Sequence, residues 1–151
     1  MTTKALQIRD AITALLTAST CGGVPATRIH KDLAFALDAG TENMPSITVE
    51  LGNEQVGRSD IDILHRTVEV TVAVLSVATK GVGAADAATN ADSPLRTAHN
   101  RIMADRTLGG IAFDLEDRDI RRERGILDKQ VMSTEILYEV GYLTSATSLE
   151  S

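Results

Sequence analysis

The segment HRTVEVTVAVLSV, residues 65–77, decides the fold, because it is the clearest strand in the sequence. Every second residue from Val68 to Val74 is a valine, so one face of an extended chain is wholly apolar. The opposite face begins polar, as at Glu69, and becomes apolar at Leu75 and Val77. The pattern predicts a strand that is half-buried at first and covered on both faces at its end, by a helix or by another subunit.

Three further segments show the alternation of apolar and polar residues that is typical of strands. One follows Pro45, which cannot donate to a sheet ladder and therefore suits the first residue of a strand. Another begins at Ile111 and becomes highly charged at its far end, and the last runs from Gln130 to Tyr142. A short extended segment at 27–30 is the fifth candidate.

Two amphipathic helices are expected beside these strands. The first spans Thr3 to Ala18, where apolar residues recur at helical spacing. The second runs from Pro94 to about Ala104, with Ser93 as its N-cap. The remaining segments are expected to be connections, namely Asp32–Asn43 with a possible turn of helix, the exposed Gly52–Asp62 and the helical or loose Gly81–Asn90.

The order of these elements predicts the fold class. Helix, strands, helix and strands, with mostly alternating strands, are typical of an α+β protein. We predict a single domain over residues 1–145 with a mostly antiparallel sheet of four to five strands, two main helices packed on one face, and a flexible tail at 146–151. A length of 151 residues, 43% of them hydrophobic, suits one core.

The composition limits the classes of partner. The chain has 15 basic and 21 acidic residues, and this net charge of −6 disfavours a broad basic face that grips nucleic-acid phosphates. The single cysteine, Cys21, excludes an internal disulfide and gives no sign of a cysteine-ligated metal. No apolar run approaches the roughly 18 residues of a membrane span, and the N-terminal segment lacks the apolar core of a signal peptide. We expect a soluble chain made inside the cell, with no membrane partner.

No catalytic, cofactor or metal site emerges from the motifs. Gly81 to Asp86 nearly spells the dinucleotide fingerprint but lacks its third glycine, so a flexible connection is favoured. Gly57 to Ile61 resembles a nucleophile elbow but lacks the second glycine and falls in a polar segment. The three histidines are scattered, without the spacing of a zinc site. We therefore expect no enzyme activity, no cofactor and no metal.

The densest charge lies between Glu116 and Arg124, where carboxylates and arginines interleave. Such residues form ion pairs more readily than a metal cage. Two interpretations stay open: a solvated face that neutralises itself, or a surface whose charges meet their opposites on a neighbouring copy. With the Gly52–Asp62 segment it supplies the candidate contact residues, which are Glu54, Arg58, Asp60, Asp62, Glu116, Asp117, Arg118, Arg121, Arg122 and Arg124.

A turn is predicted between the second helix and the strand after it. Asp105 can help to end the helix, and Leu108 can pack into the core. Gly109 and Gly110 can supply backbone angles that other residues disfavour. These residues serve as a structural turn whatever the function of the protein.

The segment MADRTLGGIA, residues 103–112, resembles the helix-end, turn and strand-start signature of phage tail-terminator proteins, the minor tail protein U-like family of long-tailed phages. Other segments are similar in the same order over most of the chain: IRDAI at 8–12, MPSITV at 44–49, GNE at 52–54, DSPL at 92–95 and YEVGYLT at 138–144. The chain departs from the family pattern at 81–90 and 116–124.

The resemblance implies a virion structural protein that forms a homohexameric ring on the tail tube, stops its growth and presents a surface for head attachment. The implied partners are other copies of the chain, the tail tube protein, the head-completion or connector protein and, in a contractile tail, the sheath terminus; DNA only passes through the lumen. The implied location is the head-proximal end of the tail, after assembly in the host cytoplasm. A head-completion or neck protein is the alternative, and a small hydrolase or a nucleotide-binding module is more remote.

Overall fold

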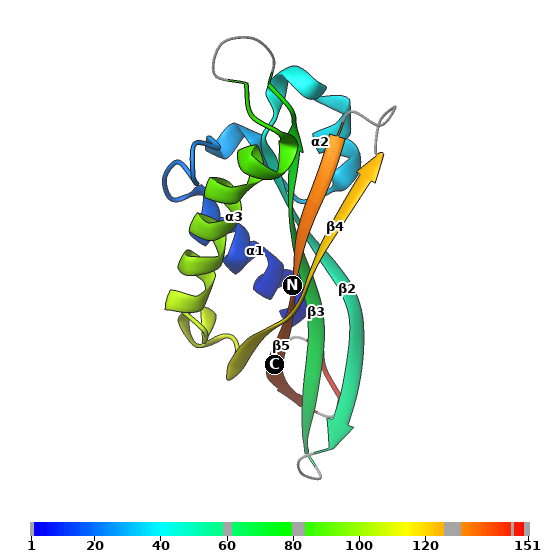
Figure 1. Ribbon diagram of the computed structural model, residues 1–151. Coiled ribbons are helices and arrows are strands. Elements are labelled where there is room, and N and C mark those ends of the chain that lie inside the picture. Colours follow the sequence, from blue (N-terminus) through cyan, green and yellow to red (C-terminus); the bar gives the residue numbers. More distant parts are fainter. Residues whose placement is uncertain (1, 59–61, 80–83, 126–130, 146, 150–151) are drawn as a thin grey trace.

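The strand predicted at 65–77 lies at the centre of the sheet (Figure 1). The observed strand, β3 (Ile63–Val77), pairs antiparallel with a strand on each side. The sheet order is β1-β2-β3-β5-β4, and the other strands are β1 (Ile29–His30), β2 (Ser46–Arg58), β4 (Asp114–Gly125) and β5 (Val131–Ser145). This computed structural model describes residues 2–58, 62–79, 84–125, 131–145 and 147–149, and within them it confirms the predicted α+β class with a mostly antiparallel sheet.

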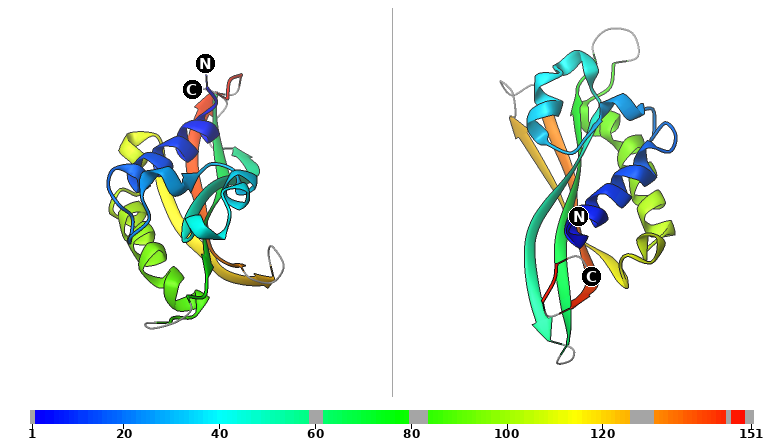
Figure 2. Two further views of the ribbon diagram at one scale, coloured as in Figure 1. Left: turned by 90° about the horizontal axis from the view of Figure 1, so that it is seen from above. Right: turned by 180° about the vertical axis from the view of Figure 1, so that it is seen from behind.

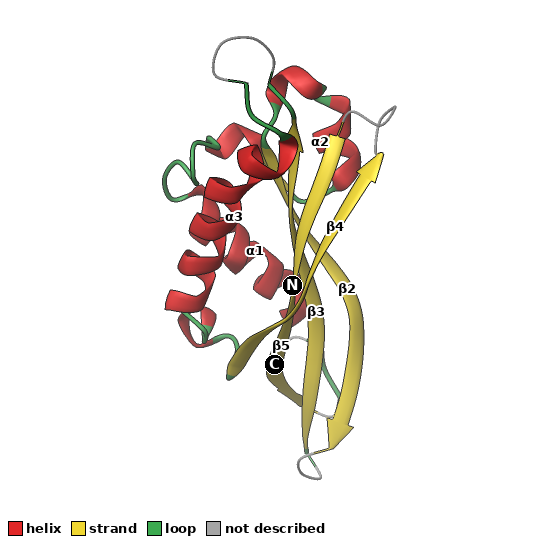
Figure 3. Ribbon diagram, in the orientation of Figure 1, coloured by secondary structure: helices red, strands yellow, loops and turns green. Residues whose placement is uncertain are grey.

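Two helices cover one face of the sheet, as predicted; we call it the helix face (Figures 2 and 3). They are α1 (Lys4–Thr17), capped by the Thr3 hydroxyl, and α3 (Ala87–Ala104). Fully buried aliphatic residues such as Ile12 and Ile102 pack against the valines of β3. Burying each such side chain stabilises the fold by about 1.5–3 kcal/mol, so the helix face holds the main core.

The opposite face, called here the open face, is covered only at one end of the sheet. Helix α2 (Leu33–Asp38) follows β1, and its Ala36 forms a second small core with Leu75 and Val131. The predicted second apolar face at the end of β3 is thus confirmed, and a helix of the same chain covers it. The short 3-10 turns η1 (Ala26–Arg28), η2 (Thr41–Asn43) and η3 (Leu108–Gly110) complete the connections.

The predicted start of the second helix is wrong. Helix α3 begins at Ala87, and Pro94 lies inside it, with Ser93 as an ordinary helical residue. The Asp86 carboxylate accepts a hydrogen bond of 2.7 Å from the Thr89 N–H, so a good N-cap and an alanine-rich first turn set the start earlier. The helical alternative for the end of the 81–90 segment is therefore the one observed from Ala87 onward, whereas 80–83 lies outside the described residues.

The segment predicted as an exposed loop, Gly52 to Asp62, is largely strand. β2 continues to Arg58, because a bulge between Leu51 and Glu54 absorbs the residues that break the apolar alternation. The bulge shifts the phase of the pattern without ending the backbone pairing. The strand predicted to begin at Ile111 begins instead at Asp114, where β4 follows the η3 turn.

The two ends of the chain lie close together. The N- and C-terminal segments lie side by side, where the Lys4 N–H donates to the Leu149 carbonyl over 3.0 Å (Figure 2). The division into a domain at 1–145 and a flexible tail at 146–151 stays a prediction. Among the described residues, no helix is both long and apolar enough to cross a membrane.

Candidate assembly surface

The two charged segments singled out in the sequence lie at opposite edges of one sheet (Figure 1). Glu54 and Arg58 belong to β2, whereas residues 116–124 belong to β4. Asp62 is exposed just before β3, and Asp60 lies outside the described residues. Strands β3 and β5 separate the two segments, so they form two distinct lateral surfaces.

The β2 edge is open over most of its length. β1 pairs only with Ile47 and Thr48, so no described strand lies beside β2 from Val49 to Arg58. On this edge Val56 is 57% exposed, and the Glu54 carboxylate accepts a hydrogen bond from the Tyr142 hydroxyl. The backbone N–H and C=O groups that face outward here are available to another chain.

The β4 edge is open along its whole described length, because β4 pairs only with β5. Nine of its twelve residues are charged. Arg118 forms a two-point ion pair with Glu139 at 3.0 and 3.1 Å, and Arg121 pairs with Asp119 at 2.8 Å. Within the described chain Arg122 makes no salt bridge. The strand is therefore self-neutralised in part.

An apolar residue interrupts the charge of β4. Ile120 is 50% exposed and faces a hollow of about 190 Å³ between the strand and α3, with Leu95 and Ile136 on its other sides. The two main helices leave this outermost part of the helix face uncovered. Exposed aliphatic residues thus occur on both open edges, at Val56 and Ile120.

The open face of the sheet is acidic. The register places Glu69, Glu139 and Glu116 side by side on β3, β5 and β4. Arg118 forms salt bridges with Glu116 and Glu139. Burial, then the nearby carboxylates of Asp32 and Glu135, raise the pKa of Glu50 on the same face.

The histidines occupy structural positions that the sequence pattern does not reveal. The His99 Nδ1 atom lies 2.8 Å from the hydroxyl of Tyr138, which is fully buried and thereby satisfied. His65 packs on the exposed Phe113 ring, with centroids 4.6 Å apart. No group of three or more potential metal ligands occurs in the part of the chain that is described.

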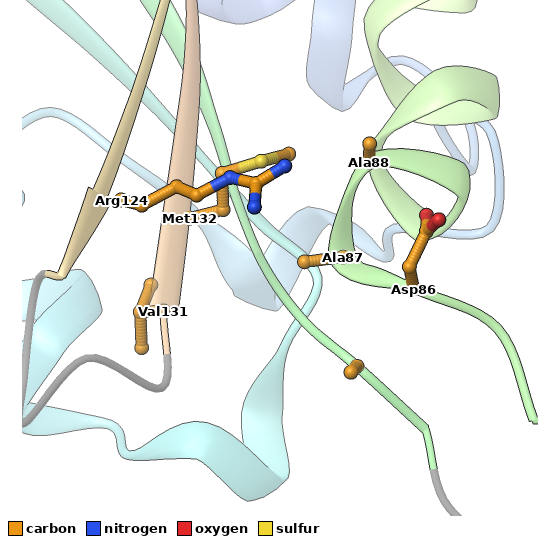
Figure 4. A pocket seen from close by; sticks show the side chains of 7 residues that line it. Asp86, Ala87, Ala88, Arg124, Val131 and Met132 are labelled. Carbon is orange, nitrogen blue, oxygen red and sulfur yellow. The ribbon is translucent and has the colours of Figure 1, made fainter.

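A hollow of about 250 Å³ lies between the start of α3 and the sheet (Figure 4). Its lining is mostly small and apolar, with Arg124 reaching across Met132 towards Asp86. Asp86 is already engaged as the α3 N-cap. Among the described residues that line this hollow, Asp86 and Arg124 are the two charged ones, and no serine, threonine, cysteine or histidine occurs.

The predicted turn has a defined geometry. Asp105 is the C-cap of α3, and its N–H donates to Ile102. Leu108 is 3% exposed and packs in the main core, while Gly109 and Gly110 adopt φ values of 71° and 93°. These left-handed angles are ones that glycine adopts without strain.

The comparisons with known proteins are sparse. No family model matches the chain, and no curated protein matches it. A solved structure described as the virion of a native gene transfer agent particle contains a similar chain, with 12% identity and a TM-score of 0.48. The likeness covers 91% of this chain and 95% of that chain. At this identity and score it assigns neither a family nor a function.

Proposed function

We propose that the protein is a non-enzymatic tail-terminator subunit, which forms a homohexameric ring at the head-proximal end of a phage tail. The ring caps the tail tube, ends its polymerisation and offers a surface to the head-completion or connector protein. The colinear resemblance of the sequence to that family supports the proposal, and one structural observation carries it furthest. The two segments expected to make contacts lie on two different, open edges of one sheet.

A closed ring requires such an arrangement. Head-to-tail assembly uses two unlike lateral surfaces on each subunit, and rotation closes the ring. The β2 and β4 edges meet this requirement, whereas a two-fold dimer would need one self-complementary surface. The acidic open face would then line the passage, where its charge would keep DNA from adhering to the wall.

The mass of the purified protein in solution tests the proposal, measured by light scattering over a concentration series and followed by imaging. A hexamer with a central hole is expected. A stable dimer would contradict the ring, and a strict monomer would move the test to the capping of purified tail tubes. Failure to cap tubes would then refute the proposed function.

The passage can be tested by charge reversal on the open face. Replacing Glu69 and Glu139 by lysine should slow DNA release through assembled tails, because the wall would then attract phosphate. Unchanged DNA passage in particles that carry the variant ring would contradict this role.

A further inference from the structure

We propose that neighbouring copies in the ring join through their sheets, with β4 of one copy pairing antiparallel to β2 of the next. In this register Ile120 lies opposite Val56, and Arg122 lies opposite Glu54. The inference rests on the proposed ring and names the contact that closes it. The partner is a second copy of this chain.

The strand directions allow a continuous sheet. β2, β3, β5 and β4 alternate in direction, so the two edge strands run opposite to each other. If the ring axis runs roughly along the strands, equivalent strands point the same way in every copy. The β4 strand of one copy then lies beside the β2 strand of the next copy in antiparallel orientation. In this register the pairing satisfies outward backbone groups over residues 51–58 of β2 and 118–125 of β4.

The exposed side chains select one register. Val56 and Ile120 both lie on the helix face, because they are paired in register with Arg66 on β3 and with the buried Ile136 on β5. They are 57% and 50% exposed in the single chain, at edges where proteins usually place charge to prevent unwanted pairing. Setting them opposite each other buries both.

The same register pairs the neighbouring charges. Two residues along the strands, Glu54 meets Arg122, which has no salt bridge within the described chain. A shift of two residues in one direction would set Val56 opposite Arg122. A shift of two residues in the other direction would set Glu54 opposite Ile120. Opposite charges across strands fix register more than they add affinity.

The geometry of closure agrees with this register. Within one copy, the strand pairing sets Val56 of β2 at the same height as Tyr142 of β5, and therefore at the height of the residue before Asp114 on β4. In the proposed contact, Val56 of the next copy lies at the height of Ile120 on the same β4. From one copy to the next, equivalent residues are therefore offset along the strands by about six residues, with the β4 bulge taken into account, or about 20 Å. The four long strands of one copy are about 19 Å wide. This offset requires strands tilted by about 45°, at the upper end of the 35–45° seen in barrels.

The hand of the tilt is also correct. The connection from β3 through α3 to the parallel strand β4 is expected to be right-handed. Seen from the helix face with β4 pointing upward, the next copy then lies to the right of β4. The offset then makes the strands lean upward to the right, the hand that sheet twist imposes. The bulky helices lie outside, and the acidic open face lies inside a ring that is about 50 Å across for six copies.

Cysteine cross-linking of the full chain tests the contact. The variant Val56→Cys/Ile120→Cys should form, on oxidation with copper phenanthroline, a ladder of covalent oligomers that ends at the hexamer. The control Gln55→Cys/Ile120→Cys should lose this ladder, because Gln55 and Ile120 lie on opposite faces of the sheet. A mixture of the two single variants should stop at the dimer. The native Cys21 is buried and common to all variants.

The outcomes separate the contact from the function. Hexameric rings by native mass spectrometry without a ladder would overturn the edge pairing and leave the tail-terminator role standing. Equal ladders from the test variant and the Gln55→Cys control would also overturn it, and so would a monomer that forms none. A ladder from protein that fails to cap tail tubes would support the pairing and refute the proposed function. Circular dichroism checks that each variant is folded.

Discussion

Replacing Arg101 by methionine should destabilise the protein, because this side chain caps the end of another helix. From α3, the Arg101 guanidinium donates to the Leu16 carbonyl in the last turn of α1 at 3.1 Å. It also donates to the carbonyls of Ser19 and Thr20, just beyond that helix, at 3.0 and 2.6 Å. The last four carbonyls of α1 have no partner within their own helix. Arg101 therefore ties the two main helices of the helix face to each other.

The magnitude follows from these bonds. A hydrogen bond to a charged group contributes about 1.5–3 kcal/mol, and the bonds share one guanidinium at a partly exposed site, so we expect a total loss of about 2–3 kcal/mol. Arginine and methionine have similar helix propensities, so α3 itself should be unaffected. In a chain of this size the loss corresponds to a fall in Tm of about 5–10 °C.

Arg96→Met is the matched control. Arg96 lies on the same helix, is 68% exposed and only approaches Asp92, at 3.7 Å. An exposed pair of this kind contributes about 0.3–0.5 kcal/mol. Urea and thermal unfolding followed by far-ultraviolet circular dichroism would measure both variants. An Arg101→Met protein as stable as the wild type, or an equal loss from Arg96→Met, would refute the reasoning.

Three other substitutions have defined outcomes. Gly22→Ala should cost about 3 kcal/mol or more in urea unfolding, since φ is +56° and the new Cβ would lie 2.4 Å from a backbone oxygen; Gly23→Ala, with open space, should cost about 1–2 kcal/mol. Glu50→Gln should raise Tm at neutral pH, because burial and two nearby carboxylates raise the pKa of Glu50; the gain, under about 1 kcal/mol, should vanish as pH falls below the ordinary glutamate range. Tyr138→Phe should cost about 1 kcal/mol in unfolding by leaving His99 unpaired, and a stability equal to wild type would show the bond to be weak.

The strands that face a core on one side were predictable from the sequence. Alternation located β3 and β5, since burial of one face imposes a period of two on their residues. The same signal failed at Gly52–Asn53, where a bulge shifts the phase, and along β4, where an edge strand exposes charge on both faces. The start of α3 was missed because Pro94 imitates a first helical residue within a helix already begun.

The candidate surface was predictable only as a list of residues. Composition identified the charged segments, because dense mixed charge indicates solvent or a partner whatever the fold. Their positions on opposite edges depend on the order of strands, which places β5 between β3 and β4. No local pattern in the sequence encodes that order, and the exposed Val56 and Ile120 acquire meaning only from it.

The position of β5 has a consequence for assembly. Suppose that β4, with its present direction parallel to β3, had paired directly with β3, and that β5 had formed the outer edge. The β2 and β5 edges would then run in the same direction, and a head-to-tail ring would need parallel pairing. Insertion of β5 makes the four long strands alternate, so the free edges are antiparallel and can continue one pattern from copy to copy. The insertion also leaves the most charged strand outermost, where its carboxylates and arginines can be matched by a specific partner and repel an arbitrary one.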